Sequence, residues 1–296
     1  MFPDLTPVTD VLGWVVIGVF LIGIAADWRS RDAARTVTTT AWALFGLFWL
    51  LMVPFFAFDH RSIIQAVLAA VAVPACGYVA YRLATGRDSL LILSRAVGVM
   101  GLIYLPFGVI PVFHDTLIEI VAAQTNAGLQ LIGSTPVFET DDAGLQNTFA
   151  FTLDSGQTYA TRIVFACTGI GSIAIFGGLI SAVRAPLKRR LAALVVAIST
   201  IWVLNIARNV FIAYSTGHQL FAQELLAGPV MWLFGLDNPI RVSFFVADRI
   251  LSQGLAVFAL LAIAWLVVKL LPELYVIVED LAHLLTGEEY DLGGQG

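Results

Sequence analysis

Charged residues are scarce in this chain. Only 12% of its 296 residues are Asp, Glu, Lys or Arg, whereas 59% are hydrophobic, and the mean hydropathy is +0.88. A typical soluble domain carries about 25% charged residues, and a disordered chain is poor in hydrophobic ones. The composition therefore excludes both classes, together with a coiled coil and a secreted disulfide scaffold, and indicates an integral membrane protein.

Basic side chains and cysteines are also few. The 16 Lys and Arg residues are outnumbered by 21 Asp and Glu residues, and a net charge of −5 leaves no basic surface suited to nucleic acid. The two cysteines, Cys76 and Cys167, form neither a C-x-x-C pair nor a metal-ligand spacing. We therefore expect no nucleic-acid partner, no metal and no other cofactor.

Long apolar runs, by contrast, are abundant. About 20 helical residues cross the hydrocarbon layer of a membrane. The runs near that length, each bounded by charge, are residues 11–26, 37–58, 63–83, 90–113, 163–183, 191–214 and 242–271. The sequence predicts an all-α polytopic membrane protein with about seven transmembrane helices.

The basic residues predict its orientation. They cluster after the first, third and fifth runs, and residues 114–160 contain no Lys or Arg. Because basic loops stay in the cytoplasm, we expect the N-terminus outside and the C-terminus inside. The transmembrane part then covers residues 1–272. A cytoplasmic tail follows at 273–296, with an amphipathic helix at 274–285 and a flexible Gly-rich acidic end.

Two outer segments differ from plain loops. The segment 113–161 has an amphipathic run at 116–131, and then residues 136–140 and 148–153 with turn residues between them, which predicts a small extracellular helix and a β-hairpin. The segment 215–241 is apolar and contains Trp232. We expect it to lie in the membrane interface, where tryptophan is favoured.

A thiol and two guanidinium groups lie at one predicted depth. At 1.5 Å per helical residue, Cys167, Arg208 and Arg249 are each about 9 to 10 Å below the outer surface. Charges inside a span are costly and usually functional. Sequence periodicity does not decide whether the three helices meet. Asp248, beside Arg249, either pairs with another span or tunes this site.

These residue types point to acyl transfer. Nearby cations lower a thiol pKa from about 8.5 and populate the reactive thiolate. Arginine is no general base, so Arg208 and Arg249 would stabilise first the thiolate and then an acyl oxyanion. Acyl transfer by this thiol would proceed through a thioester on Cys167. The sequence lacks H-E-x-x-H and G-x-S-x-G, and Cys76 is expected to be an apolar packing residue.

Three short segments carry a family resemblance. Residues 166–170 (ACTGI), 205–209 (NIARN) and 247–249 (ADR) resemble the exosortase/archaeosortase family. Its pattern is a Cys in a C-[ST]-G context, an Arg at the end of the next span, and a third residue that is His in most exosortases and Arg in others. The resemblance assigns these roles to Cys167, Arg208 and Arg249, with Arg241 as second choice for the third, within an archaeosortase domain at 1–272.

The resemblance implies a cysteine transpeptidase-like enzyme of the cell membrane, with its active site near the extracellular face. Its partners would be secreted surface proteins, surface-layer glycoproteins above all, with a C-terminal Pro-Gly-Phe motif, a transmembrane helix and a basic cluster. The enzyme would cleave near the motif and join the new C-terminus to the amine of a membrane phospholipid. Lipid phosphate, water, Tyr159, Tyr214 and Asp248 all remain candidates for moving the protons.

Two other functions remain open on the sequence. In the first, a non-enzymatic lipid-phosphate-binding or transport protein, Arg208 and Arg249 clamp phosphate while Cys167 only packs. In the second, a plain protease, water hydrolyses the thioester. Loss of function in Cys167→Ala excludes the first, and mass spectrometry of the product's new C-terminus distinguishes the second.

Overall fold

The computed structural model describes residues 7–152, 156–286 and 288. The chain forms two compact units, and each is described by itself. Unit 1 lies within Met1–Leu105, Ser172–Ile198 and Ala262–Gly296, and unit 2 within Pro106–Gly171 and Ser199–Leu261. The division falls inside four helices, which therefore contribute residues to both units: α4 (Leu90–Val109), α6 (Ile170–Ala182), α7 (Leu187–Gly217) and α10 (Gln253–Leu270).

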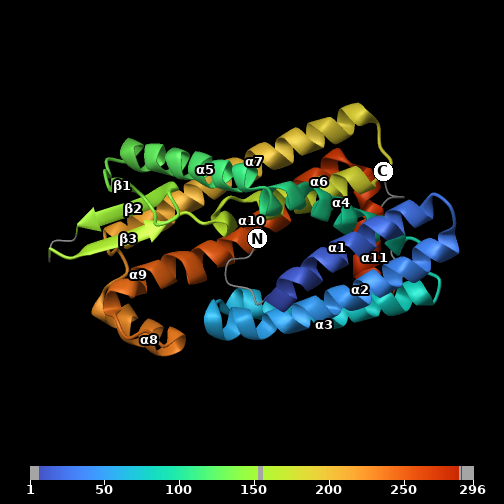
Figure 1. Cartoon of the computed structure of the whole chain (residues 1–296), viewed down its shortest axis with the longest axis horizontal. Helices are drawn as coiled ribbons and strands as arrows, with labels where there is room; N and C mark the ends of the chain where they lie inside the picture. Colours follow the sequence, from blue (N-terminus) through green and yellow to red (C-terminus); the bar gives the residue numbers. More distant parts are fainter. Residues whose placement is uncertain (1–6, 153–155, 287, 289–296) are drawn as a thin grey trace. The chain divides into compact units, whose positions relative to one another are not determined.

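Unit 1 has a helical core. Helices α1 (Pro7–Asp27), α2 (Arg31–Pro54) and α3 (Ile63–Ala84) lie side by side (Figure 1). Ser30 and Ser62 cap the N-termini of α2 and α3, because each side chain accepts a hydrogen bond from a backbone N–H of the first turn. Cys76 is buried among apolar side chains of these helices, close to Gly46 of α2. It is a free cysteine in a packing position, as expected.

Several helices have the length and composition of membrane spans. Among the described residues, five helical stretches qualify: Arg31–Asp59, which joins α2 to the π-helical η1 (Phe55–Asp59), Ile63–Ala84, Leu90–Val109, Leu187–Gly217 and Pro239–Leu270. Shorter apolar helices cover Val11–Asp27, Ile170–Ala182 and Leu225–Phe234. The mostly helical architecture is confirmed, whereas the count of seven and the N-out/C-in orientation stay predictions.

The fourth predicted span, 90–113, is too long. Helix α4 ends at Val109, and a separate helix, α5 (Pro111–Leu131), follows with proline at its first position. A residue before proline avoids the helical conformation, and Ile110 is extended. The predicted extracellular helix at 116–131 is therefore the later part of a 21-residue helix.

The fifth predicted span, 163–183, is wrong at its outer end. Helix α6 has only 13 residues and begins at Ile170. Phe165–Cys167 form a 3-10 turn, η2, and Gly169 has a φ of +78°. Cys167 consequently precedes the helix, so the depth calculated from a helical rise does not apply to it.

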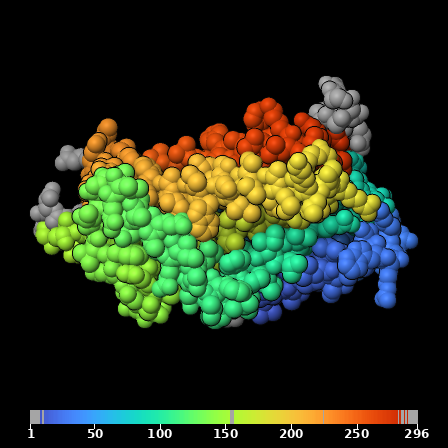
Figure 2. Space-filling view, turned by 90° about the horizontal axis from the view of Figure 1, so that it is seen from above, coloured from blue at the N-terminus to red at the C-terminus, as the bar shows by residue number. Residues whose placement is uncertain are grey.

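Unit 2 contains the predicted hairpin as part of a three-stranded antiparallel sheet. Strand β1 (Val137–Thr140) pairs with β2 (Gln146–Thr152), which pairs in turn with β3 (Thr158–Arg162). The hairpin is confirmed over these residues, residue 153 lies outside the described part, and β3 was not predicted. Strand β2 packs against α5 and buries Phe149 and Phe151. In Figure 2 the side chains of α5 and the sheet form one continuous surface.

The apolar segment 215–241 contains a helix, α8 (Glu224–Phe234), followed by the 3-10 turn η3 (Pro239–Arg241). Val230 and Phe234 are buried in a cluster with Val242 and Phe245. Trp232 and Leu225 are 86% and 84% exposed, so α8 presents an apolar face that the described residues leave uncovered. Its placement in the membrane interface stays a prediction.

The last predicted span, 242–271, is not one regular helix. A short α9 (Val242–Phe244) leads into a π-helix, η4 (Phe245–Ser252), before α10 begins. The predicted tail helix at 274–285 corresponds to α11 (Tyr275–Thr286), which follows the 3-10 turn η5 (Pro272–Leu274). The predicted Gly-rich end lies outside the described residues except for Glu288.

Candidate active site

The turn that carries Cys167 is fixed from within. The backbone N–H of Cys167 donates to the carbonyl of Val164 at 2.8 Å. The next residue, Thr168, is fully buried, and its hydroxyl donates to the carbonyl of Phe165 at 2.7 Å. Gly169 then adopts a left-handed conformation that other residues avoid, and α6 starts. The Cys-Thr-Gly sequence thus forms a rigid turn before a helix, with the thiol partly exposed.

Two asparagines of α7 hold this turn in place. The Nδ2 atoms of Asn205 and Asn209 donate to the carbonyl oxygen of Cys167 at 2.8 and 2.9 Å. Residues four apart lie on one helix face, so both amides reach the same acceptor. Gly169 permits this approach, because a Cβ there would lie only 3.1 Å from Cγ of Asn205. The backbone of Cys167 is therefore bound to the helix that carries Arg208.

Asp248 joins the two arginines. Its Oδ1 accepts a hydrogen bond from Nη2 of Arg208 at 2.6 Å, and its Oδ2 lies 3.3 Å from Nε of Arg249. The side chains of Asp248 and Arg249 are only 10% and 12% exposed. A buried carboxylate between two guanidinium groups leaves one net positive charge and orients both groups. Asp248 therefore pairs with another helix, which was one of the two alternatives left open for it, and its partner Arg208 on α7 is itself a candidate site residue.

The π-helix η4 brings Asp248 and Arg249 into this arrangement. In a regular α-helix, consecutive side chains point about 100° apart, which gave no reason to expect an ion pair between them. π-helical turns are rare and occur frequently at functional sites. Arg241, the second choice for the third position, lies over the ring of Phe245 at 5.4 Å. The charge that acts on the thiol comes from Arg249 and Arg208.

The electrostatics of the thiol differ from the prediction. Burial raises the pKa of Cys167, the charge of Arg208 opposes this rise most strongly, Asp248 adds to it, and Arg249 lowers the pKa. The net direction is upward. The two arginines lower the pKa as expected, but desolvation, which disfavours the thiolate, outweighs them, and Asp248 offsets part of their positive charge.

Three predicted site residues thus interact within unit 2, and their catalytic roles stay predictions. The positions of Asn205 and Asn209 were part of the motif, but their function was not predicted. The sequence contains a signal for this function, because two amide side chains inside an apolar run are costly to bury unless they bind a specific partner. Among the described residues, no three His, Cys, Asp or Glu side chains form a group suited to a metal ion.

Comparison with known proteins identifies the family. Residues 9–238 match the transmembrane exosortase family (Exosortase_EpsH). The chain belongs to this family. It is 51% identical to archaeosortase A of Natronomonas pharaonis over 285 residues, covering 94% of this chain and 90% of the relative. It is 46% identical to archaeosortase A of Haloferax volcanii over 294 residues, covering 96% of each. No solved structure matches the chain significantly.

Family membership and the five long apolar helices together make this chain a multi-pass membrane protein and a protein-sorting processing enzyme. The predicted resemblance is confirmed over nearly the whole chain. The turn at Cys167, the asparagines and Arg208 all lie inside the matched residues, whereas Asp248 and Arg249 follow them. The reaction chemistry, the signal that is cleaved and the side of the membrane on which the site lies are proposals.

Proposed function

We propose that this protein is a cysteine transpeptidase that cleaves a C-terminal Pro-Gly-Phe sorting signal of secreted surface proteins and transfers the new C-terminus to the amine of a membrane phospholipid. One observation carries the proposal. Half-buried Cys167 lies on a turn fixed by two asparagines, and its thiol is acted on by the charges of two guanidinium groups that share one buried carboxylate. Similarity to the two archaeosortase A proteins supports the same reaction class.

The first half of the reaction forms a thioester. Sγ of Cys167 attacks the scissile carbonyl carbon, the peptide C–N bond breaks, and the proton lost by the thiol ends on the leaving amine. During attack the carbonyl oxygen becomes negative, and preorganised guanidinium donors stabilise such an oxyanion better than they stabilise the neutral carbonyl. Arg208 uses one N–H group for Asp248, so its other donors are free for this task.

The second half transfers the acyl group. The phospholipid amine attacks the thioester carbon, the C–S bond breaks, an amide forms, and the amine's proton returns to the sulfur. No proton is gained or lost over the cycle. A substrate held by its own transmembrane helix would present the scissile bond at a high effective concentration. The outer membrane face is the side on which the basic-residue pattern predicts this site.

Trapping the intermediate tests the proposal. The purified enzyme is incubated with a sorting-signal peptide, quenched in acid and digested, and we expect an acyl adduct on Cys167 that hydroxylamine releases. Cys167→Ala should abolish both adduct and processing, and Cys76→Ala serves as the matched control. Processing by Cys167→Ala would favour the lipid-phosphate-binding or transport alternative. A product with a free carboxylate at its new C-terminus, and no lipid, would identify a plain protease.

Arg208→Lys tests the role of the guanidinium. Lysine keeps the positive charge but loses the planar fork of donors. Because Asp248 and an oxyanion need separate, correctly directed N–H groups, we expect at least a tenfold loss of kcat/KM for the peptide. A fully active Arg208→Lys enzyme would show that charge alone is enough and that oriented donors are not part of the mechanism.

A further inference from the structure

A second polar region lies entirely within unit 1, where several helices begin or end. An open cavity of about 440 Å³ is lined by the end of α1, the start of α2, the start of α4, the end of α6 and the segment from η5 to α11. Cavities of 300 to 1,000 Å³ are typical of small-molecule sites. Leu91, Val183 and Val276 contribute to its apolar wall. No residue of the candidate active site lines it.

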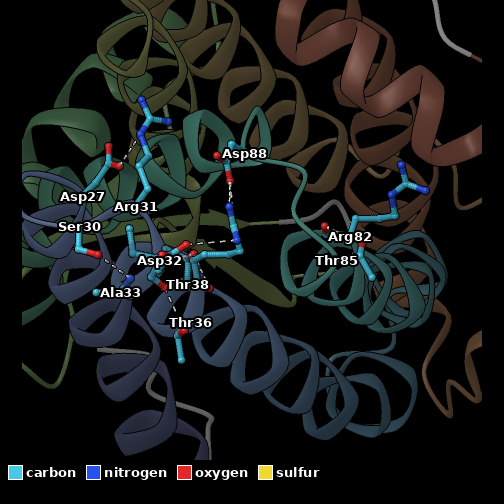
Figure 3. Close-up of polar contacts among 12 residues, drawn as sticks. Asp27, Ser30, Arg31, Asp32, Ala33, Thr36, Thr38, Arg82, Thr85 and Asp88 are labelled. Carbon is cyan, nitrogen blue, oxygen red and sulfur yellow. Dashed lines mark hydrogen bonds and ion pairs between the residues drawn. The ribbon is translucent and has the colours of Figure 1, made fainter.

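Charged side chains of both signs line the same cavity. Three are acidic and three basic: Asp27, Asp88, Glu273, Arg31, Arg95 and Arg184. Each carboxylate accepts a hydrogen bond from an arginine, with Arg95 bound to Asp27 at 2.9 Å, Arg35 to Asp88 at 2.8 Å and Arg189 to Glu273. Figure 3 shows Arg31 reaching Asp27, and Asp88 bound by a side chain of α2. The acids are thus largely neutralised by partners they already have.

The arginines at the cavity retain unused donors. Arg184 is exposed and forms no hydrogen bond or ion pair with the described residues. Arg31 contacts Asp27 only as an ion pair, with 3.6 Å between Nε and Oδ1, and its side chain is 62% exposed. That distance is too long for a hydrogen bond. Two guanidinium groups therefore remain available for an anion, and guanidinium binds phosphate well.

The acids offer no further acceptor to a ligand. Oδ1 of Asp27 and Oε2 of Glu273 accept no hydrogen bond from the described residues, but both atoms are buried, so a group in the cavity does not reach them. The cavity thus has a place for one anion, next to an apolar wall.

We propose that this cavity binds the headgroup of a membrane phospholipid whose phosphate meets Arg31 and Arg184. The acyl chains would leave along the apolar wall. The basic residues that predict a cytoplasmic side are those around this cavity, so the lipid would come from the inner leaflet. This proposal does not depend on the thioester chemistry.

Binding is measured by native mass spectrometry on the full chain in a non-ionic detergent, with three probes. Short-chain phosphatidylethanolamine has both phosphate and N–H donors, short-chain phosphatidylcholine has phosphate without donors, and inorganic phosphate has no apolar part. We expect both phospholipids to bind with similar affinity, because the phosphate that they share is the group that the arginines meet. Inorganic phosphate should not compete at equal concentration.

Single substitutions at exposed or half-buried positions test the contacts. Arg184→Gln should weaken the binding of both phospholipids about tenfold. Lys188→Gln, an exposed basic residue outside the cavity, is the matched control and should change neither affinity. The proposal is overturned if Arg184→Gln and Lys188→Gln behave alike, or if inorganic phosphate displaces the lipids.

Discussion

Asp248 is the residue on which the orientation of both candidate catalytic arginines depends. It binds Arg208 at 2.6 Å and lies 3.3 Å from Nε of Arg249. Its negative charge also raises the pKa of the Cys167 thiol. One carboxylate therefore contacts both groups that would stabilise an oxyanion, and it adds to the rise in the thiol pKa that burial causes.

Asp248→Asn is expected to separate these two effects. Removing the negative charge leaves two guanidinium charges near the thiol, so its pKa should fall and alkylation by iodoacetamide should reach its half-maximal rate at lower pH. Peptide processing should nevertheless drop at least tenfold, because the guanidinium groups lose their common partner. Asp237→Asn, an exposed position of unit 2, is the control. An alkylation profile identical to that of the parent enzyme would contradict the electrostatic role of Asp248.

At the scale of elements, the position of Cys167 is set by the short turn η2 and not by the helix α6 that follows it. The candidate nucleophile is positioned by a 3-10 turn, a left-handed glycine and two amides from α7. If a long helix ran through Cys167, the carbonyl of Cys167 would accept a hydrogen bond from the backbone N–H four residues later in the same helix. Because the helix starts late, that carbonyl is free to accept from Asn205 and Asn209, which binds the turn to the helix of Arg208.

Gly169→Ala is expected to disrupt this turn. An L-residue at a φ of +78° is strained by roughly 1–2 kcal/mol, and the added Cβ would lie 3.1 Å from Cγ of Asn205. We expect processing to fall at least tenfold while the folded protein is still recovered from membranes. Gly171→Ala is a close control, since a Cβ there meets nothing within 4 Å. Equal activity of the two variants would show that the asparagine contacts do not matter.

The β1–β2 turn should be sensitive to acid. The backbone N–H of Leu145, with Asn147 and the N–H of Ala143, holds the pKa of Asp141 below its ordinary value. A carboxyl whose pKa is lower when folded contributes stability above its unfolded pKa and loses it as pH falls through the folded value. The protection of amides in β1 and β2 against exchange, corrected for the intrinsic exchange rate at each pH, should therefore fall below about pH 4.

Asp141→Asn should remove that pH dependence, whereas Asp142→Asn, the exposed neighbour, should keep it. Hydrogen exchange read by mass spectrometry on peptides from 137–152 reports both results. If the two variants gave the same profile as the parent chain, the contacts of Asp141 would have no part in holding the turn.

At the scale of the whole molecule, the proposed reaction requires an amine to reach the thioester before water does. Helix α8 packs through Val230 and Phe234 on the segment that leads to Asp248 and Arg249, and exposes Trp232 and Leu225. An apolar face beside the candidate site would limit access of water, which favours transfer over hydrolysis. Such an exposed face is also suited to the membrane interface.

Trp232→Ser is expected to lower the ratio of lipidated to hydrolysed product, with little effect on the rate of thioester formation. The ratio is read from the mass of the product's new C-terminus. Trp28→Ser, whose side chain is 82% exposed on unit 1, is the matched control. An unchanged ratio in Trp232→Ser would mean that α8 does not shield the intermediate.

The sequence by itself determined the membrane class, most helix positions, the β1–β2 hairpin, the family and the choice of Cys167, Arg208 and Arg249 as candidates. These features could be predicted because composition and apolar periodicity are local properties, and because motifs are read directly from the sequence. Only the tertiary structure decided that Cys167 precedes α6, that β3 joins the sheet, that η4 is π-helical, and that Asn205, Asn209 and Asp248 hold the site. These features depend on hydrogen bonds between residues far apart in the chain, which no local pattern encodes.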